Sequence, residues 1–139
     1  MNNDTVVPPN AIFWFRMGLY ENEQVGAVGS VSNHVNNDQM VKEKLGSCEE
    51  YYAYGMKRNI PMLYPYEKKA WLTGFAVMFK REVLEKVGYL DERFSPGNYE
   101  DNDLGFCSKD IHNFYVKIVL FFILVVWDFV KIKKFLMNY

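Results

Sequence analysis

Cysteine and histidine are scarce in this sequence, with two of each among 139 residues. The two cysteines, Cys48 and Cys107, are too few for the disulfide framework of a small secreted protein, so a reducing compartment is expected. No metal-binding spacing links the two histidines, His34 and His112. The first residues are polar and lack the charged-then-apolar pattern of a signal peptide. These absences predict a cytoplasmic chain.

An excess of charge of one sign is also missing. The formal net charge is −1, from 16 basic and 17 acidic residues. Without a basic excess the chain has little to neutralise phosphates with, which argues against a nucleic-acid partner. Half of the residues are hydrophobic and 17% are aromatic. That composition excludes a disordered chain and predicts a globular one with a core of its own.

The C-terminal part lacks an apolar run of membrane-spanning length. The unbroken apolar run Ile118–Trp127 has ten residues, whereas a spanning helix needs about 20. Extending the window to residues 111–132 includes Lys117, Asp128 and Lys131, and a charge near a helix centre costs roughly 2.5–3.5 kcal/mol. A buried strand or a core helix is therefore favoured. The alternative is a membrane anchor that holds the chain at the inner face of the membrane.

Hydrophobic spacing and turn residues predict strands that alternate with helices, and hence an α/β fold. Proline at residues 8 and 9 opens the first helix, and Gly88 ends the third. Helices are expected at Asn10–Leu19, Cys48–Arg58, 81–87 and 100–109, and strands at 2–7, Gln24–Val31 and Leu72–Phe79.

An acidic cluster, Glu100, Asp101 and Asp103, stands at the start of the last expected helix. Clustered carboxylates disfavour one another's ionised form, so one of them can act as a general base near neutral pH. Acidic residues are also favoured at a helix N-terminus by the helix dipole, without any catalytic role. The cluster by itself leaves both interpretations open.

The wider segment favours the catalytic interpretation. Residues 71–94 (WLTGFAVMFKREVLEKVGYLDERF) and 99–104 (YEDNDL) resemble the family 2 glycosyltransferases, GT-A fold enzymes that use nucleotide-diphosphate sugars. The shared features are a small-residue strand around Thr73-Gly74, a basic-acidic helix start, a glycine before Asp-Glu-x-Phe, and a Glu-Asp-x-Asp-Leu helix start. Upstream, Asn2-Asn3-Asp4-Thr5 is similar to the family's metal-binding motif, and Val25–Gly29 to a strand that follows it.

The resemblance implies inverting transfer of a sugar to a hydroxyl of a saccharide or glycolipid acceptor. It makes Asp101 the base that deprotonates the acceptor, with Glu100 as the fallback, and Asp103 a capping or orienting residue. Asp4 would bind Mn²⁺ or Mg²⁺, hard cations that prefer oxygen ligands. The expected substrate-binding residues are Gly74 through close backbone approach, Thr73, Trp71 and Tyr99.

Some of these residues have a plainer interpretation. Trp71 and Tyr99 are equally compatible with core packing or space filling. The second Asn-Asn-Asp sequence, Asn36-Asn37-Asp38, lies in a polar stretch and is interpreted as loop chemistry. Asp91 and Glu92 are expected to be turn and cap residues.

The resemblance covers about residues 1–110 and implies a partial GT-A fold that lacks the N-terminal nucleotide-binding strands. A partner chain that supplies the missing part is then expected. Residues 111–139 form an apolar, basic tail, for which we hypothesise a reading-frame change; translation of the genomic locus in all frames tests this. The alternative to a transferase is a non-catalytic remnant, or a membrane-associated scaffold or interaction protein.

Overall fold

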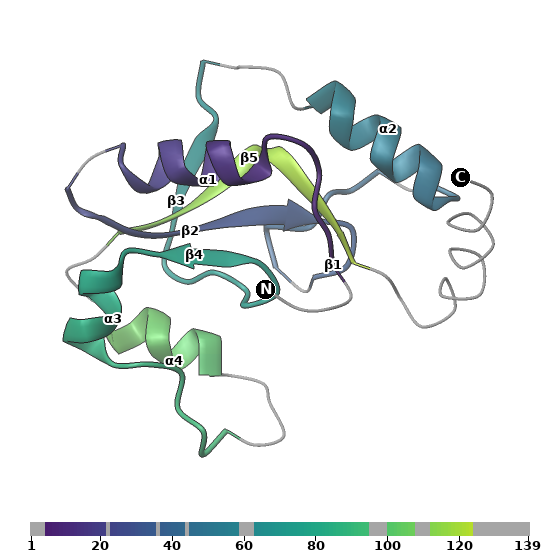
Figure 1. Cartoon of the computed structure of the whole chain (residues 1–139). Coiled ribbons are helices and arrows are strands. Elements are labelled where there is room, and N and C mark those ends of the chain that lie inside the picture. Colours follow the sequence, from purple (N-terminus) through teal and green to yellow (C-terminus); the bar gives the residue numbers. More distant parts are fainter. Residues whose placement is uncertain are drawn as a thin grey trace.

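The computed structural model describes residues 5–21, 23–35, 37–43, 45–58, 63–94, 100–107 and 112–123. Strands and helices alternate along most of these ranges (Figure 1), so the predicted α/β class is confirmed. The strands are β1 (Thr5–Val6), β2 (Val25–Ser32), β3 (Tyr66–Lys69), β4 (Val77–Phe79) and β5 (His112–Ile123). The helices are α1 (Ala11–Leu19), α2 (Cys48–Arg58), α3 (Arg81–Val87) and α4 (Glu100–Cys107).

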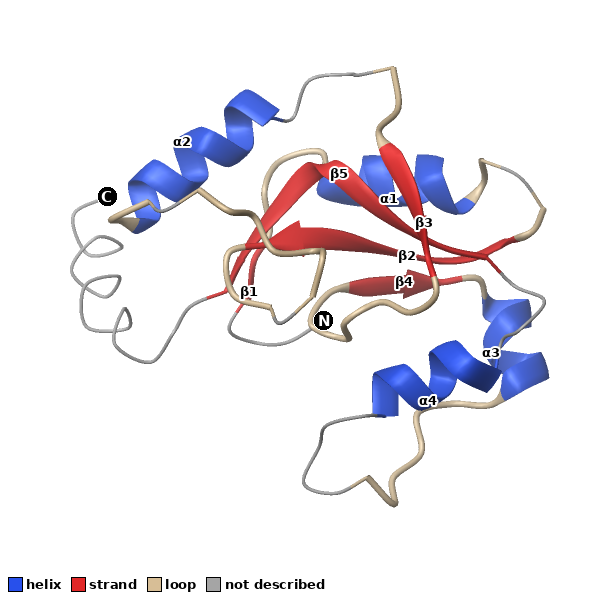
Figure 2. Cartoon of the chain, turned by 180° about the vertical axis from the view of Figure 1, so that it is seen from behind, coloured by secondary structure: helices blue, strands red, loops and turns tan. Residues whose placement is uncertain are grey.

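The strands form one mixed sheet with β5 and β2 at its centre. Strand β2 runs parallel to β5 and antiparallel to β4, so that Val28 lies opposite Phe114 on one side and Met78 on the other. The second edge of β5 is shared by two short antiparallel strands, β3 along its first part and β1 at its end. Figure 2 shows β2 and β5 side by side across the middle of the molecule.

The first part of the apolar tail therefore belongs to the sheet. Pairing between β5 and β2 extends from His112 to Phe121, so this part of the tail is a strand, one of the two structures that its length favours. The rest of the tail, residues 124–139, lies outside the described residues. None of the helices in the described ranges is both long and apolar enough to cross a bilayer.

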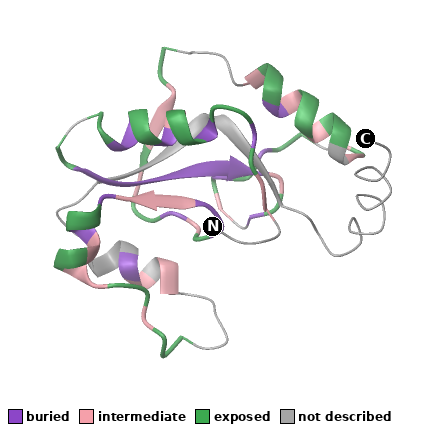
Figure 3. Ribbon diagram, viewed as in Figure 1, coloured by how far each residue is buried: buried purple, intermediate pink, exposed green. Residues whose placement is uncertain are grey.

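Two hydrophobic cores lie on opposite faces of the sheet. In the first, Phe15 and Leu19 of α1 pack against Val25 and Val28 of β2. Strand β2 is buried along its whole length (Figure 3). Each large apolar side chain that is fully buried in this way contributes about 1.5–3 kcal/mol. Packing against α1 thus explains why an eight-residue strand rich in small residues forms the middle of the sheet.

The second core lies beneath α2. Tyr51 and Tyr54 of α2 pack against a buried group that includes Val31 and Leu72. Strand β4 shows that the two cores are on different faces, because Met78 packs against the first core while its neighbours Val77 and Phe79 pack against the second. The sheet is therefore a middle layer with a helix on each side.

Gly18 allows α1 and β3 to pack closely. A Cβ atom at Gly18 would lie 2.5 Å from Cε1 of Tyr66. The Tyr66 hydroxyl donates a hydrogen bond of 3.1 Å to the backbone oxygen of Trp14, which fixes the ring against α1. Burial, with a smaller effect of Glu21, raises the pKa of Tyr66 to about 12.

The variant Gly18→Ala should therefore lower the free energy of unfolding by about 1–2 kcal/mol. Overpacking a filled site costs roughly 1–3 kcal/mol, and the better helix propensity of alanine recovers at most about 1 kcal/mol. Urea denaturation measures the change. Gly46→Ala is the control, because its Cβ would meet Glu50 Oε2 only at 3.5 Å. Equal stability of Gly18→Ala and wild type would contradict the packing described here.

All four predicted helices are confirmed, and Cys48–Arg58 matches α2 at both ends. Residues 108 and 109, predicted as the end of the fourth helix, lie outside the described residues. The predicted strand Leu72–Phe79 is wrong in its first part, since only Val77–Phe79 is a strand. Leu72 remains buried, but the backbone around Gly74 turns instead of extending. The N–H groups of this turn bond to side chains from elsewhere in the chain.

Candidate functional site

The turn at Thr73-Gly74 is held by two hydrogen bonds to distant side chains. The Thr73 N–H donates to Oε1 of Gln39 at 2.9 Å, and the Gly74 N–H donates to Oδ2 of Asp101 at 2.8 Å. Leu72, one residue before the turn, is buried in the second core. The position of the turn is thus fixed by the packing of Leu72 and by hydrogen bonds to Gln39 and Asp101.

Gln39 connects this turn to the central strand. Its side chain is almost completely buried, at 1% exposure, and its Nε2 donates to the backbone oxygen of Ser30 at 2.8 Å. The loop that carries Gln39 is pinned to the end of β2, because the Ser32 N–H donates to the Gln39 oxygen and the Val41 N–H donates to the Ser32 oxygen, both at 2.8 Å. A buried amide with several partners positions its neighbours because each lost bond leaves a buried group unpaired.

Asn37 completes the network from the second Asn-Asn-Asp sequence. Its Nδ2 donates to Thr73 Oγ1 at 2.7 Å and to Gln39 Oε1 at 3.0 Å. Its Oδ1 accepts the Gln39 N–H at 2.9 Å. The sequence of Asn36-Asn37-Asp38 predicts loop chemistry only, whereas Asn37 bonds to the predicted site residue Thr73, which is 36 positions away in the chain.

The side chain of Asp101 lies directly over Gly74. A Cβ atom at Gly74 would be 3.2 Å from the Asp101 Cβ and 3.5 Å from its Oδ2. Glycine therefore permits the N-terminus of α4 to approach the turn closely. The sequence predicts that Gly74 leaves this space for a sugar, whereas in the structure the neighbour of Gly74 there is Asp101, the residue predicted as the base.

The carboxylates of α4 have different surroundings. Asp101 is half-buried and bonded to the Gly74 N–H. Oε2 of Glu100 is buried and has no hydrogen-bond partner among the described residues, an arrangement that costs roughly 1–3 kcal/mol or more for a charged group. Asp101 is therefore the carboxylate whose position is fixed by the turn.

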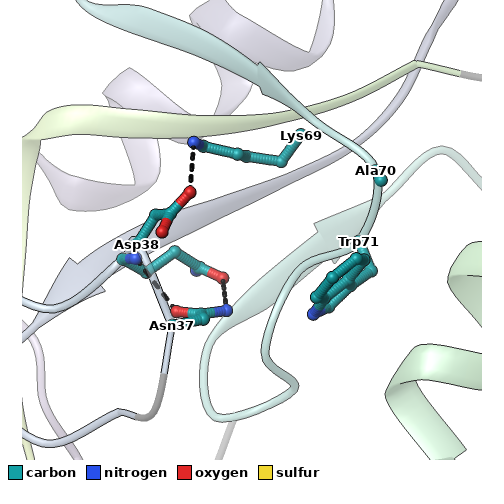
Figure 4. A pocket seen from close by; sticks show the side chains of 6 residues that line it. Asn37, Asp38, Lys69, Ala70 and Trp71 are labelled. Atoms are coloured by element: carbon teal, nitrogen blue, oxygen red, sulfur yellow. Dashed lines mark hydrogen bonds and ion pairs between the residues drawn. The ribbon is translucent and has the colours of Figure 1, made fainter.

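A pocket of about 240 Å³ opens beside this network. Figure 4 shows Asn37 and Asp38 on one side of it and Ala70 and Trp71 on the other. The Lys69 ammonium forms ion pairs with Asp38 at 2.9 Å and with Glu67 at 2.8 Å. The full lining consists of Asn37, Asp38, Gln39, Lys69, Ala70 and Trp71.

The structure thus brings three of the predicted site residues together, namely Thr73, Gly74 and Asp101, and places Trp71 at the adjoining pocket. Asp4 and Tyr99 lie outside the described residues. Within the described ranges, no group of three or more histidine, cysteine, aspartate or glutamate side chains is arranged to hold a metal ion. The assignment of a divalent cation to Asp4 stays a prediction.

Asp91 belongs to a turn between α3 and α4 and not to this network. Its Oδ1 accepts the Arg93 N–H at 2.9 Å, and its carboxylate pairs with the Arg93 guanidinium. Hydrogen bonding to Arg93 lowers the pKa of Asp91 to about 2. The interpretation of Asp91 as a turn residue is confirmed. Gly88 ends α3 at the predicted position, but with φ 96° and ψ −179° it adopts an extended positive-φ backbone that glycine tolerates, and not the predicted left-handed helical cap.

The chain matches none of the protein families, curated proteins or solved structures with which it was compared. A functional assignment for the site therefore depends on its own residues and their geometry.

Proposed function

We propose that this chain, with a partial GT-A fold, transfers a sugar from a nucleotide-diphosphate sugar to an acceptor hydroxyl with inversion and metal assistance, and that Asp101 is its catalytic base. The observation that carries the proposal is the hydrogen bond of 2.8 Å from the Gly74 N–H to Asp101 Oδ2. It joins Gly74 in the first segment of the resemblance to Asp101 in the second, and these two residues are 27 positions apart in the chain. An accidental similarity in sequence gives no reason for these two segments to meet.

In the proposed reaction, Asp101 removes the proton from an acceptor hydroxyl while the oxygen of that hydroxyl attacks the anomeric carbon of the donor. The C–O bond to the nucleotide diphosphate breaks on the opposite face, so the anomeric configuration inverts. A general base must lie within about 2.6–3.2 Å of the atom whose proton it takes. The Gly74 N–H holds the Asp101 carboxylate in one place. This preorganisation lowers the entropic cost of orienting the base during the reaction.

The remaining predicted residues have binding roles in this proposal. The N–H groups of Thr73 and Gly74 bond to Gln39 and Asp101, so these two residues would meet the substrate through the Thr73 hydroxyl and their backbone oxygens. Trp71 and Tyr99 would contribute aromatic surface. Asp4, which directly precedes β1 in sequence, would hold Mn²⁺ or Mg²⁺, and the bound cation supplies charge to offset the departing diphosphate.

Binding of nucleotide-diphosphate sugars with and without Mn²⁺ tests the donor part of the proposal. We expect binding in the presence of Mn²⁺ and affinity at least about tenfold lower without it, or in Asp4→Ala, which corresponds to 1.4 kcal/mol. Isothermal titration calorimetry on the full chain measures both. Glu49→Ala, which removes a carboxylate from the exposed start of α2, should bind as the wild type does. Equal affinity with and without the metal would contradict the role of Asp4.

A further inference from the structure

The pocket beside the turn exposes an aromatic ring next to polar groups. Trp71 is 40% exposed although the residue that follows it, Leu72, is buried. An exposed indole face is suited to a ligand with a flat apolar side. Pyranose rings have such a side, formed by their C–H groups, and carry hydroxyls around the rim. Asp38, whose side chain is 79% exposed, offers carboxylate oxygens that can accept hydrogen bonds from those hydroxyls.

The charges around the pocket select against anions. The Lys69 ammonium lies between two carboxylates, those of Asp38 and Glu67. Asp38 and Lys69 line the pocket and Glu67 does not, but Glu67 pairs with the same ammonium, so the three groups together carry a formal charge of −1. A diphosphate, a uronic acid or another anion would meet net repulsion here, whereas an uncharged sugar would not. We therefore do not expect this pocket to bind the diphosphate of the donor.

The pocket is also small and lies next to the proposed base. Its volume of about 240 Å³ is below the roughly 300–1,000 Å³ of pockets for drug-sized ligands, which suits one ring. Asn37 lines the pocket and bonds to Thr73 Oγ1, and the next residue, Gly74, bonds to Asp101. The pocket and the base are thus parts of one connected network.

We propose that this pocket binds one uncharged pyranose ring of the acceptor, with the ring stacked on Trp71 and its hydroxyls bonded to Asp38. The side of the ring away from Trp71 then faces the hydrogen-bonded loop that carries Asn37. Only the designation of the ring as acceptor rests on the proposed transferase function. The binding of a neutral sugar follows from the aromatic surface, the charge and the size of the pocket.

Ligand-observed saturation-transfer NMR on the full chain tests this inference. The neutral probes are the methyl glycosides of glucose, galactose and mannose, and the anionic probe is glucuronate. At least one neutral glycoside should bind, and glucuronate should bind about tenfold more weakly or worse than methyl glucoside. If no neutral glycoside binds, or if glucuronate binds as tightly as methyl glucoside, the inference is overturned.

Three variants locate the binding. Trp71→Ala should weaken binding of the neutral glycoside about tenfold, and Trp71→Phe should retain most of it. Asp38→Asn removes a negative charge and should therefore reduce the difference in affinity between glucuronate and the neutral probe. Tyr89→Ala removes another exposed aromatic side chain, outside the pocket, and should change nothing. Wild-type affinity in Trp71→Ala would overturn the inference, and Trp71→Phe and Asp38→Asn keep the test decisive if the alanine variant does not fold.

The outcome is separable from that of the proposed function. Metal-dependent binding of a nucleotide sugar without any neutral glycoside binding would overturn the pocket assignment and leave the transferase proposal in place. Glycoside binding at Trp71 without any donor binding would support the pocket assignment and contradict the transferase proposal.

Discussion

Replacing Asp101 with asparagine should lower the rate of sugar transfer about 100- to 10,000-fold, the usual contribution of a positioned general base. Asparagine has nearly the same shape, and its carbonyl oxygen can still accept the Gly74 N–H that bonds to Asp101 Oδ2 at 2.8 Å. The amide cannot accept a proton from the acceptor hydroxyl. The turn and α4 should therefore stay together while the chemistry is lost. Release of nucleotide diphosphate and the melting temperature, measured on the same preparation, separate the two effects.

The same substitution at Asp103 is the matched control, because Asp103 lies on the same helix and has been given a capping or orienting role. Asp103→Asn should retain the wild-type rate within a few-fold. Glu100→Gln tests the fallback base and should also retain most of the rate. Transfer at the wild-type rate by Asp101→Asn, or loss of transfer in Glu100→Gln alone, would show that Asp101 is not the base.

Replacing Gln39 with leucine should lower the free energy of unfolding by about 2–5 kcal/mol. Leucine is similar in size but removes the acceptor of the Thr73 N–H and the donor to the Ser30 oxygen. Leaving a buried polar group without a partner costs about 1–3 kcal/mol for each group. Gln39 is 1% exposed, so water has little access to replace either bond. Urea denaturation followed by circular dichroism measures the loss.

Lys42→Leu provides the comparison on the same loop. Lys42 is exposed, and an exposed substitution usually changes stability by no more than about 0.5 kcal/mol. Gln39→Leu should also weaken the hold on the Thr73-Gly74 turn, so that its amide hydrogens exchange faster than in the wild type. Stability and exchange equal to those of Lys42→Leu would mean that Gln39 does not organise the site.

The helices could be predicted because the signals that define them are local. Proline at residues 8 and 9 precedes α1, acidic residues begin α2 and basic residues end it, and Gly88 follows α3. Strand β2 was similarly evident, since an eight-residue run of small and apolar residues is typical of a buried strand. Each of these segments carries its own boundary residues.

The other strands depend on contacts that are distant in sequence. Tyr66–Lys69 contains three charged residues and has no apolar alternation, yet it forms β3 because it pairs with Asn113–Val116 of β5. The region before β4 has strand-forming residues, but its Thr73 and Gly74 N–H groups bond to Gln39 and Asp101. Local propensity cannot anticipate hydrogen bonds to side chains more than 25 positions away in the chain.

The site shows the same division. Asp101, Thr73 and Gly74 were found because they belong to a recognisable pattern, and the structure brings them into contact. Asn37 and Gln39 were not, because a polar residue in a loop is usually solvated, and only the tertiary structure shows that Gln39 is buried. The one available signal was their position: a polar Asn-Asn-Asp-Gln sequence shortly after a strand buried along its whole length.

Proton NMR of the anomeric signals during a reaction of the full chain tests the central claim most directly. The reaction contains a nucleotide-diphosphate sugar, Mn²⁺ and a neutral glycoside acceptor. The account predicts that the donor's anomeric signal is replaced by a glycosidic signal of opposite configuration, with one nucleotide diphosphate released per sugar transferred. An unchanged donor signal, or a product in which the configuration is retained, would contradict it.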